Sequence, residues 1–396
     1  MKQVILYSTL NPFPHWAGSE NLWYDLVLNI ENIKDLHFQV CLADSPVTRQ
    51  KAKLLGMSGV STSFYIHHND SIIRRNLFRI KDKILGKKQR SYPWFDLIGK
   101  EKADLVFFNV AALADLAELT YAVDLCMKNN IPYWLLLQHG YEDFFLSSAE
   151  EIERVKKVVH NAKRFIFISY RNRASLERAI GENLQNAFHS VNAISAEKLR
   201  KAKEQDDLYP LGAGTRARFF NLGRFSPRDK AQHKLLEVFS GKQWEYRDWQ
   251  LSFIGVSGFG RESLETMIKY YKLDPNRICI IPHIENVLEE IVRHDMLLMP
   301  SLSEGTPFAM VESMACGRPA VGTPVGGIPE IILDGQTGWL SSSTDVAAFA
   351  EKVDQCWKEK DMWQEYGRNA RELVNKEYNQ DNTFATLIQL LESDAK

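Results

Sequence analysis

Short apolar runs alternate with longer amphipathic stretches along the first half of the chain. Some runs are continuously apolar, such as DLVFFN at 104–109 and PYWLLLQ at 132–138. Strands covered by helices on both faces of a parallel sheet show this pattern, because neither face then meets water. The pattern predicts strands at 3–8, 38–43, 62–67, 104–108, 132–138, 164–169 and 186–191. It predicts helices at 19–31, 111–129, 149–162 and 170–180.

The second half repeats this alternation without repeating the sequence. Strands are expected at 217–223, 250–256, 277–282, 295–299, 319–323 and 337–340, and the segment 361–394 is expected to be helical throughout. Between the halves, residues 198–216 change to charges and then to proline and glycines, as a linker does. The pattern therefore predicts an α/β protein with two doubly wound domains, 1–205 and 206–379, whose ligands bind at the carboxyl ends of the strands.

Composition limits the class of protein. With 396 residues, 45% of them hydrophobic, the chain is long enough for two ordinary globular cores. Its 49 basic and 50 acidic side chains give a net charge of -1, which argues against nucleic acid as a partner. The five cysteines form no CxxC pair and indicate reduced, buried thiols. No signal peptide and no membrane-spanning run is visible, so we expect a cytoplasmic protein.

One segment departs from this charge balance. Residues 72–90 read IIRRNLFRIKDKILGKKQR, in which Asp82 is the sole acidic residue among eight basic ones. Apolar residues recur at helical spacing along the segment. A basic amphipathic helix of this kind can lie peripherally on an anionic membrane surface, here the cytoplasmic face. Alternatively, its apolar side packs on the domain and its charges are solvated.

The segment 303–321, SEGTPFAMVESMACGRPAV, predicts a loop that leads into a short helix. Thr306 can cap the helix and Pro307 suits its first position, while Gly317 can end it. A helix N-terminus preceded by Gly305 offers unpaired N–H groups and a partial positive charge, which suit a phosphate.

Two carboxylates flank this helix start, Glu304 before it and Glu312 within it. Carboxylates suit hydroxyl groups rather than a phosphate, so a sugar and a ribose on either side of the phosphate are indicated. The later segment 323–332, TPVGGIPEII, repeats the strand–glycine–helix pattern, and its paired glycines would let the backbone pass close to a ligand.

Two cations follow the strand predicted at 217–223. Arg224 ends this strand and Lys230 begins the next helical pattern, so both are placed at the ligand edge of the second sheet. They either bind phosphate or are solvated surface charges. The strand at 250–256 delivers Gly255, but its GxxGxG spacing is not that of a dinucleotide fold, and we expect only flexible backbone near a ligand.

The ligand edge of the first sheet offers two further candidates. Gly18 precedes a helix start and allows close backbone approach to a ligand, although such glycines are often structural. His139 follows the strand at 132–138 and can shuttle a proton or donate a hydrogen bond, although lone histidines are also often structural. The ten histidines form no metal-spaced cluster, so no metal site is expected.

Taken together, these residues resemble family 4 of the retaining, nucleotide-sugar-dependent glycosyltransferases. The resemblance runs from 219 to 340 and rests on Glu304-x7-Glu312, on the following GTPVGGIPEIILDGQTGWL, and on Arg224-x5-Lys230. It implies the GT-B fold, in which two Rossmann-like domains face a cleft and a final helix, here 380–396, returns to the first domain.

The resemblance also implies roles for the motif residues. Arg224 and Lys230 would hold the donor diphosphate, Glu304 the donor sugar and Glu312 the ribose. The backbone of the segment Gly305, Thr306, Pro307 and Phe308 would meet the phosphate and sugar. No cofactor is expected; the donor would be a nucleotide sugar, most frequently a uridine diphosphate sugar in this family. One departure is Ala231, where the family commonly has glycine.

The predicted function is transfer of a sugar to a glycan or lipid-linked saccharide in bacterial surface-polysaccharide assembly. Two alternatives stay open. One is a sugar-nucleotide epimerase of the same fold, and the other is a non-catalytic two-lobed sugar-binding protein.

Overall fold

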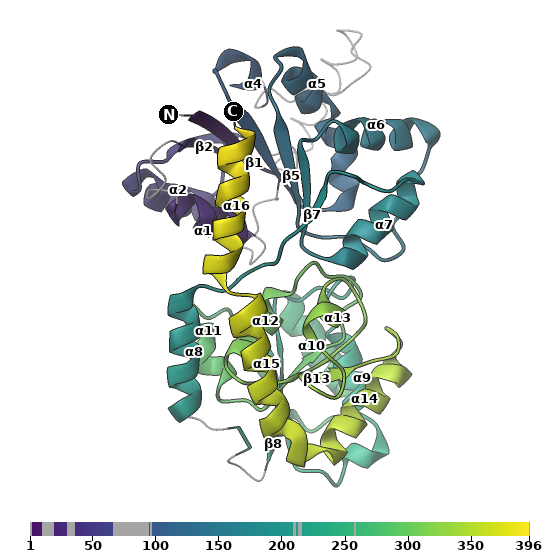
Figure 1. Cartoon of the computed structure of the whole chain (residues 1–396). Helices are drawn as coiled ribbons and strands as arrows, with labels where there is room; N and C mark the ends of the chain where they lie inside the picture. Colours follow the sequence, from purple (N-terminus) through teal and green to yellow (C-terminus); the bar gives the residue numbers. More distant parts are fainter. Residues whose placement is uncertain are drawn as a thin grey trace. The chain divides into compact units, whose positions relative to one another are not determined.

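The computed structural model describes residues 2–9, 20–29, 36–65, 95, 97–208, 211–212, 216–256 and 259–395. The chain divides into two compact units, Met1–Ser190 with Phe384–Lys396 and Val191–Thr383. Each unit holds a parallel sheet with helices on both of its faces (Figure 1). Gly18 and the basic segment 72–90 lie outside the described residues, so the predictions for them stay predictions.

The first sheet has the strand order β3-β2-β1-β4-β5-β6-β7, so the chain adds β2 and β3 on one side of β1 and the later strands on the other. Its strands are β1 (Lys2–Ser8), β2 (Leu36–Ala43), β3 (Ser61–Tyr65), β4 (Leu105–Val110), β5 (Tyr133–Leu137), β6 (Arg164–Phe167) and β7 (Ala187–His189). The accompanying helices are α1 (Asn21–Asn29), α2 (Pro46–Met57), α4 (Leu97–Lys100), the 3-10 helix η5 (Leu113–Leu119), α5 (Thr120–Lys128), α6 (Ala149–His160), α7 (Tyr170–Ile180) and α16 (Gln380–Asp394).

The second sheet has the strand order β10-β9-β8-β11-β12-β13, and the order in which strands are added reverses between β8 and β11. Its strands are β8 (Ala217–Leu222), β9 (Trp249–Ile254), β10 (Ile278–Ile281), β11 (Met296–Met299), β12 (Ala320–Gly322) and β13 (Gly338–Leu340). Its helices are α8 (Ala196–Leu208), α9 (His233–Phe239), η6 (Lys242–Trp244), α10 (Phe259–Tyr270), η7 (Pro275–Arg277), α11 (Val287–Ile291), α12 (Phe308–Ala315), α13 (Ile328–Ile331), α14 (Val346–Lys358), η8 (Lys360–Met362) and α15 (Trp363–Glu377).

The last helix, α16, belongs to the core of the first unit. Its apolar side packs with α1, α2 and one face of the first sheet through Phe384, Leu387 and Leu391. Complete burial of each such side chain contributes roughly 2 kcal/mol of hydrophobic stabilisation. The opposite face of the sheet is covered by α5, α6 and α7.

The continuously apolar runs form strands, as their pattern predicts. All six residues of β4 and all five residues of β5 are buried. The predicted class, two doubly wound α/β domains, is confirmed. One difference is the segment 111–129, which is a 3-10 helix followed by α5 rather than a single helix.

The first part of the expected linker, residues 198–208, belongs to a helix of the second unit, α8. The division between the units falls after Ser190, whereas the sequence pattern placed it after residue 205. Leu199 and Ala202 of α8 pack in the core of the second unit. Asp206 pairs with the buried Arg318 and with Arg371, which fixes the far end of α8.

The expected continuous helix over 361–394 is broken at Tyr378 and Asn379. The backbone N–H of Ile194 donates to Tyr378 O at 2.8 Å, and the N–H of Gln380 donates to Ile194 O at 3.0 Å. These bonds join the segment entering the second unit to the segment leaving it. The break therefore depends on a contact across nearly two hundred residues of chain rather than on local preference.

Candidate functional site

The strand ends at the reversal point of the second sheet carry the predicted cations and carboxylate. Strands β8 and β11 are neighbours, with Phe219 paired to Met296. Their carboxyl ends therefore meet, as ligand-binding edges do in open α/β sheets. The following loops are joined directly, because the carbonyl oxygen of Asp229 accepts hydrogen bonds from the N–H groups of Leu302 and Ser303.

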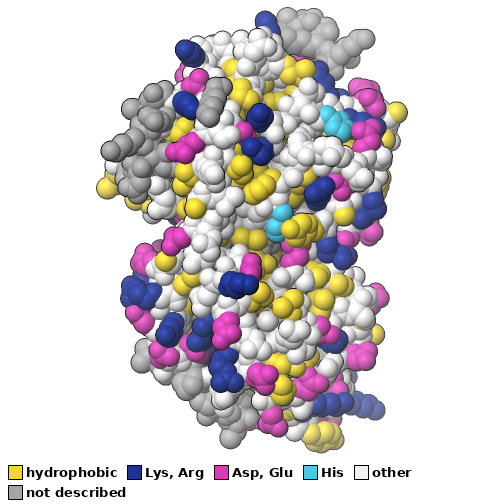
Figure 2. Space-filling model, viewed as in Figure 1, with side chains coloured by type: hydrophobic (Ala, Val, Ile, Leu, Met, Phe, Trp, Pro, Cys, Tyr) yellow, Lys and Arg dark blue, Asp and Glu magenta, His cyan; other side chains and the backbone are white. Residues whose placement is uncertain are grey.

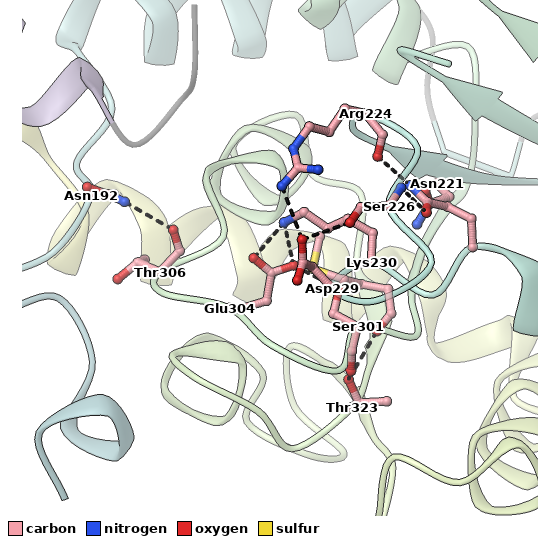
Figure 3. Close-up of polar contacts among 12 residues, drawn as sticks. Asn192, Asn221, Arg224, Ser226, Asp229, Lys230, Ser301, Glu304, Thr306 and Thr323 are labelled. Atoms are coloured by element: carbon pink, nitrogen blue, oxygen red, sulfur yellow. Dashed lines mark hydrogen bonds and ion pairs between the residues drawn. The ribbon is translucent and has the colours of Figure 1, made fainter. Parts of the chain in front are cut away.

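Lys230 and Glu304 form a close ion pair across these two loops (Figure 3). The Lys230 Nζ lies 2.7 Å from both carboxylate oxygens of Glu304. The Glu304 side chain is 4% exposed and that of Lys230 is 25% exposed. Ser301 Oγ donates a further hydrogen bond of 2.8 Å to Glu304 Oε1. The carboxylate is thereby held in one position at the edge of the sheet.

Arg224 lies in the same loop but is more exposed. Its Nη2 donates to Asp229 Oδ2 at 3.1 Å, and Ser226 Oγ donates to the same oxygen at 2.7 Å. Half of the Arg224 side chain is accessible to solvent. The buried Gln232 secures the loop, because its side chain accepts from Ser226 N and donates to Arg224 O.

Ala231, which stands where the resembling family has glycine, has a left-handed backbone. Its φ is +48°, in the left-handed region that a residue with a Cβ atom adopts at a cost of about 1 kcal/mol. Two hydrogen bonds to Ser226 O, from the N–H groups of Lys230 and Ala231, hold this turn. The alanine therefore keeps the glycine-like backbone that positions Lys230.

The glycine segment after β12 supports the Glu304 loop. Gly327 N donates to Gly305 O at 2.7 Å, and Thr323 Oγ1 donates to Ser301 O at 2.6 Å. At Gly326, whose φ is +51°, a Cβ would lie 2.2 Å from Glu304 O. These glycines thus allow close approach of the 304–305 backbone, and their predicted approach to a ligand stays a prediction.

The helix that follows, α12, begins one residue later than expected. Pro307 is the residue before its first turn rather than the first helical position, and Thr306 is therefore not its cap. The helix runs from Phe308 to Ala315, and Gly317, with φ +67°, follows its end as predicted. The carbonyl oxygen of Thr306 accepts a hydrogen bond of 3.2 Å from Asn192 Nδ2, and both residues are buried.

Glu312 points to a partner that the sequence pattern did not identify. Lys198 of α8 donates to Glu312 Oε1 at 2.9 Å, and its Nζ lies 4.9 Å from the centre of the Phe308 ring. The Glu312 side chain is largely buried, whereas Lys198 is well exposed. The sequence pattern does not indicate this contact, because Lys198 lies in the charged stretch whose composition is that of a linker.

Gly255 has a structural role that the sequence pattern did not distinguish from ligand binding. Its φ is +91°, and a Cβ there would lie 3.2 Å from Gly223 O. The glycine lets the ends of β8 and β9 approach each other, next to the loop that carries Arg224.

The first unit carries His139, at the end of β5. Its ring contacts Tyr141 edge to face at 5.2 Å, and its carbonyl oxygen accepts from Leu113 N at 3.2 Å. The structure thus brings Lys230, Glu304 and Arg224 together in the second unit, while His139 belongs to the other unit.

A buried polar network in the first unit was not predicted. The Glu20 carboxylate accepts hydrogen bonds from Ser8 Oγ, from Asn109 Nδ2 at 2.7 Å and from Trp23 Nε1 at 3.0 Å. Burial raises the pKa of Glu20 to about 7, against the lowering effect of these donors. Asn109 in turn accepts from Gln138 Nε2 at 2.8 Å. The network joins the ends of β1, β4 and β5.

The described residues contain no group of three or more histidine, cysteine or acidic side chains placed to hold a metal ion. Within that same part of the chain, no helix is both long and apolar enough to cross a bilayer. On the face seen in Figure 2, basic and acidic side chains are interspersed over the second unit, in keeping with the balanced net charge.

Comparison with known proteins identifies the second unit. Residues 210–373 match the family described as glycosyl transferases group 1. This segment is a group 1 glycosyltransferase domain. It contains Arg224, Lys230, Glu304 and Glu312, so the resemblance to family 4 enzymes is confirmed.

Curated relatives agree with the family. An uncharacterised glycosyltransferase of Methanocaldococcus jannaschii is 35% identical over 251 residues, which cover 63% of this chain and 65% of the relative. WcaL of Salmonella typhimurium, a glycosyltransferase assigned to colanic acid biosynthesis, is 29% identical over 177 residues, 41% of this chain and 42% of WcaL. The chain thus spans less than two thirds of the length of either relative.

Solved structures establish the fold over the whole chain. Anabaena HepE in complex with uridine diphosphate matches with a TM-score of 0.71 at 15% identity, covering 99% of this chain and 100% of HepE. The chain therefore has the predicted GT-B fold, with one Rossmann-like sheet in each unit.

Proposed function

We propose that the chain is a retaining, metal-independent glycosyltransferase. It would move a hexosyl or related sugar from a nucleoside diphosphate sugar to a glycan or a lipid-linked saccharide. The observation that carries this proposal is the Lys230–Glu304 pair, held at the carboxyl edge of the second sheet in a group 1 domain. Uridine diphosphate is proposed as the nucleotide, because the similar HepE has been solved with uridine diphosphate and with UDP-glucose.

The two cations would stabilise the departing diphosphate. An ammonium group has three N–H bonds, and two of those of Lys230 reach Glu304, which leaves the third for a phosphate oxygen. Arg224 is half exposed and offers a planar fork that matches phosphate geometry. Such preorganised charge lowers the barrier at the moment when negative charge develops on the leaving group. With Lys230 and Arg224 as hydrogen-bond donors, we propose that the diphosphate is bound without a metal ion.

The remaining motif residues would bind the sugar and the nucleoside. The N–H groups at the start of α12, together with the backbone from Gly305 to Phe308, suit the phosphate and the sugar. Glu304 would accept hydrogen bonds from donor sugar hydroxyls, and Glu312 from the ribose. The Glu312 carboxylate is held by Lys198, which would orient it for two neighbouring hydroxyls.

The pairing of Glu304 argues against a double displacement through this carboxylate. A carboxylate paired to an ammonium through both oxygens is a weak nucleophile, so a covalent glycosyl–Glu304 intermediate is disfavoured. We propose substitution on one face of the sugar. The bond between the anomeric carbon and the phosphate oxygen breaks with its electron pair on oxygen, and the acceptor oxygen bonds to that carbon. The departing phosphate oxygen takes the acceptor proton.

The acceptor is proposed to be bound by the first unit, with His139 near the reacting hydroxyl. Relatedness to WcaL supports a role in polysaccharide assembly. An acceptor presented at the cytoplasmic membrane face would fit the basic segment 72–90. Co-sedimentation with anionic liposomes tests this point, and binding unchanged after neutralising Arg74, Arg75, Lys87 and Lys88 would count against it.

The donor is tested by thermal unfolding in the presence of a panel of nucleotide sugars. A ligand at a hundred times its Kd stabilises the folded protein by about 2.7 kcal/mol, which is measurable as a rise in the unfolding midpoint. We expect uridine diphosphate sugars to raise the midpoint more than adenosine or guanosine diphosphate sugars. No shift with any nucleotide sugar would contradict the proposal.

Product analysis separates the remaining alternatives. A transferase forms a new glycosidic bond with the donor's anomeric configuration, visible in the proton coupling constant of the product. An epimerase would release an epimeric free sugar nucleotide, and a binding protein would release neither product.

A further inference from the structure

The ends of three neighbouring strands in the first unit carry aromatic rings. In the sheet, Leu137 of β5 pairs with Phe167 of β6, and Phe167 pairs with His189 of β7. His139 follows two residues after Leu137, and Tyr170 follows three residues after Phe167. These rings are therefore gathered at the carboxyl edge of the first sheet, the edge at which ligands of such sheets bind.

Tyr170 and His189 form a parallel stack. Their ring centres are 3.9 Å apart and their planes differ by 10°. Tyr170, the first residue of α7, is 57% exposed, and His189 ends β7 and is half-buried. A large aromatic side chain normally gains stability by burial. The exposure of Tyr170 instead leaves apolar ring surface in contact with water.

The loop after β5 lies against the same helix. His139 and Tyr141 contact each other edge to face, and Tyr141 is also exposed. A Cβ on Gly140 would lie 3.0 Å from the side chain of Asn172 in α7, so loop and helix are in close contact. Arg178 of α7 donates to Glu142 O at 2.9 Å, which fixes the loop further.

A charged pair is formed by the residues that follow Tyr170 and Tyr141 in the chain. Arg171, next to Tyr170, donates two hydrogen bonds to Glu142, of 2.9 and 3.0 Å. Both side chains are partly exposed. The edge thus combines apolar ring faces with fixed hydrogen-bond donors and acceptors beside them. A pyranose ring has matching chemistry, because one face presents C–H groups and its rim presents hydroxyls.

We infer that the Tyr170–His189 stack is a platform on which a pyranose ring of the acceptor lies, with Arg171 and Glu142 at its hydroxyl rim. The negative face of an aromatic ring attracts the weakly positive C–H groups of the sugar. The inference deepens the proposed function and rests on it, because it names the acceptor side of the same reaction. It requires a carbohydrate acceptor rather than a protein or a purely lipid alcohol.

Saturation-transfer NMR on the full chain tests the platform, with methyl glucoside, galactoside, mannoside and N-acetylglucosaminide as probes. For at least one glycoside, we expect the strongest saturation transfer at the protons on one face of its pyranose ring. Tyr170→Ala should raise its Kd about fivefold to tenfold, and Tyr170→Phe should keep the wild-type value. His189→Ala, which removes the supporting ring, should also weaken binding. Tyr246→Ala is the matched control, since Tyr246 is 92% exposed in the second unit.

Uridine diphosphate binding, measured on the same samples, separates this inference from the proposed function. Its affinity should be unchanged in Tyr170→Ala, which also shows that the variant is folded. If uridine diphosphate binds but no glycoside does, or if the glycoside binds Tyr170→Ala and His189→Ala as it binds wild type, the platform is wrong. If uridine diphosphate does not bind the wild type, the proposed function itself fails.

Discussion

Lys230 and Glu304 neutralise each other: the lysine nitrogen is 2.7 Å from both carboxylate oxygens, and the carboxylate is almost completely buried. The residues are 74 positions apart in the chain and meet because β8 and β11 are neighbours. Removal of either one leaves the other as a partly or fully buried charge without its partner, which is costly. Their variants therefore need a stability measurement beside any rate.

Arg224 can be tested with less effect on stability, because half of its side chain is exposed. Arg224→Ala should lower kcat about a hundredfold through loss of charge at the leaving diphosphate, and Arg224→Lys should recover part of that loss. Arg216→Ala is the control, since Arg216 is equally exposed and also pairs with an aspartate. Equal rates for Arg224→Ala and Arg216→Ala would show that Arg224 does not bind the leaving diphosphate.

The role of Glu312 is best tested with the nucleotide rather than with the rate. In wild type, 2′,3′-dideoxy-UDP should bind about tenfold more weakly than UDP, because it lacks the hydroxyls that donate to the carboxylate. Glu312→Gln should reduce this preference, as measured by isothermal titration. Glu265→Gln, at a surface ion pair of α10, should keep it. A preference that persists undiminished in Glu312→Gln would place the ribose elsewhere.

Glu20 predicts a pH dependence of stability in the first unit. Burial raises its pKa from 4.5 to about 7, so between these values the folded chain keeps a proton that the unfolded chain releases. The contribution of Glu20 to the free energy of unfolding is therefore full below pH 4.5 and falls as the pH rises to 7, by at most roughly 3 kcal/mol.

Glu20→Gln lacks this titration. The unfolding midpoint of wild type, measured relative to Glu20→Gln in matched buffers, should fall between pH 5 and pH 8. A constant difference between the two proteins across that range would show that Glu20 is ionised throughout.

Much of the fold was predictable because parallel strands buried on both faces are read directly from continuous apolar runs, as in β4 and β5. The spacing of the motifs also identified Arg224, Lys230 and Glu304, which the structure brings together, while their roles in binding a ligand stay predictions. Their contacts were not predictable, because neither the strand order nor the Asp229 bonds to the neighbouring loop are properties of one segment.

The errors share a physical cause, which is dependence on distant partners. The charged composition of α8 is typical of a linker. It does not reveal that Ala202 packs in the core or that Lys198 and Asp206 form ion pairs with distant residues. The end of α15 at Tyr378 depends on hydrogen bonds with Ile194. The Glu20 network likewise needs Asn109, which is 89 residues away.

The most direct test of the account is phosphorus NMR of a uridine diphosphate sugar incubated with the protein and a glycan or lipid-linked acceptor extract. We expect the donor diphosphate signals to be replaced by those of free UDP in wild type and in Lys352→Ala, which removes a different surface ion pair of the second unit. In Lys230→Ala, checked for an intact unfolding transition, the rate should fall about a hundredfold to a thousandfold. Release of UDP at the wild-type rate by folded Lys230→Ala would contradict the account, as would the absence of release by wild type with every donor.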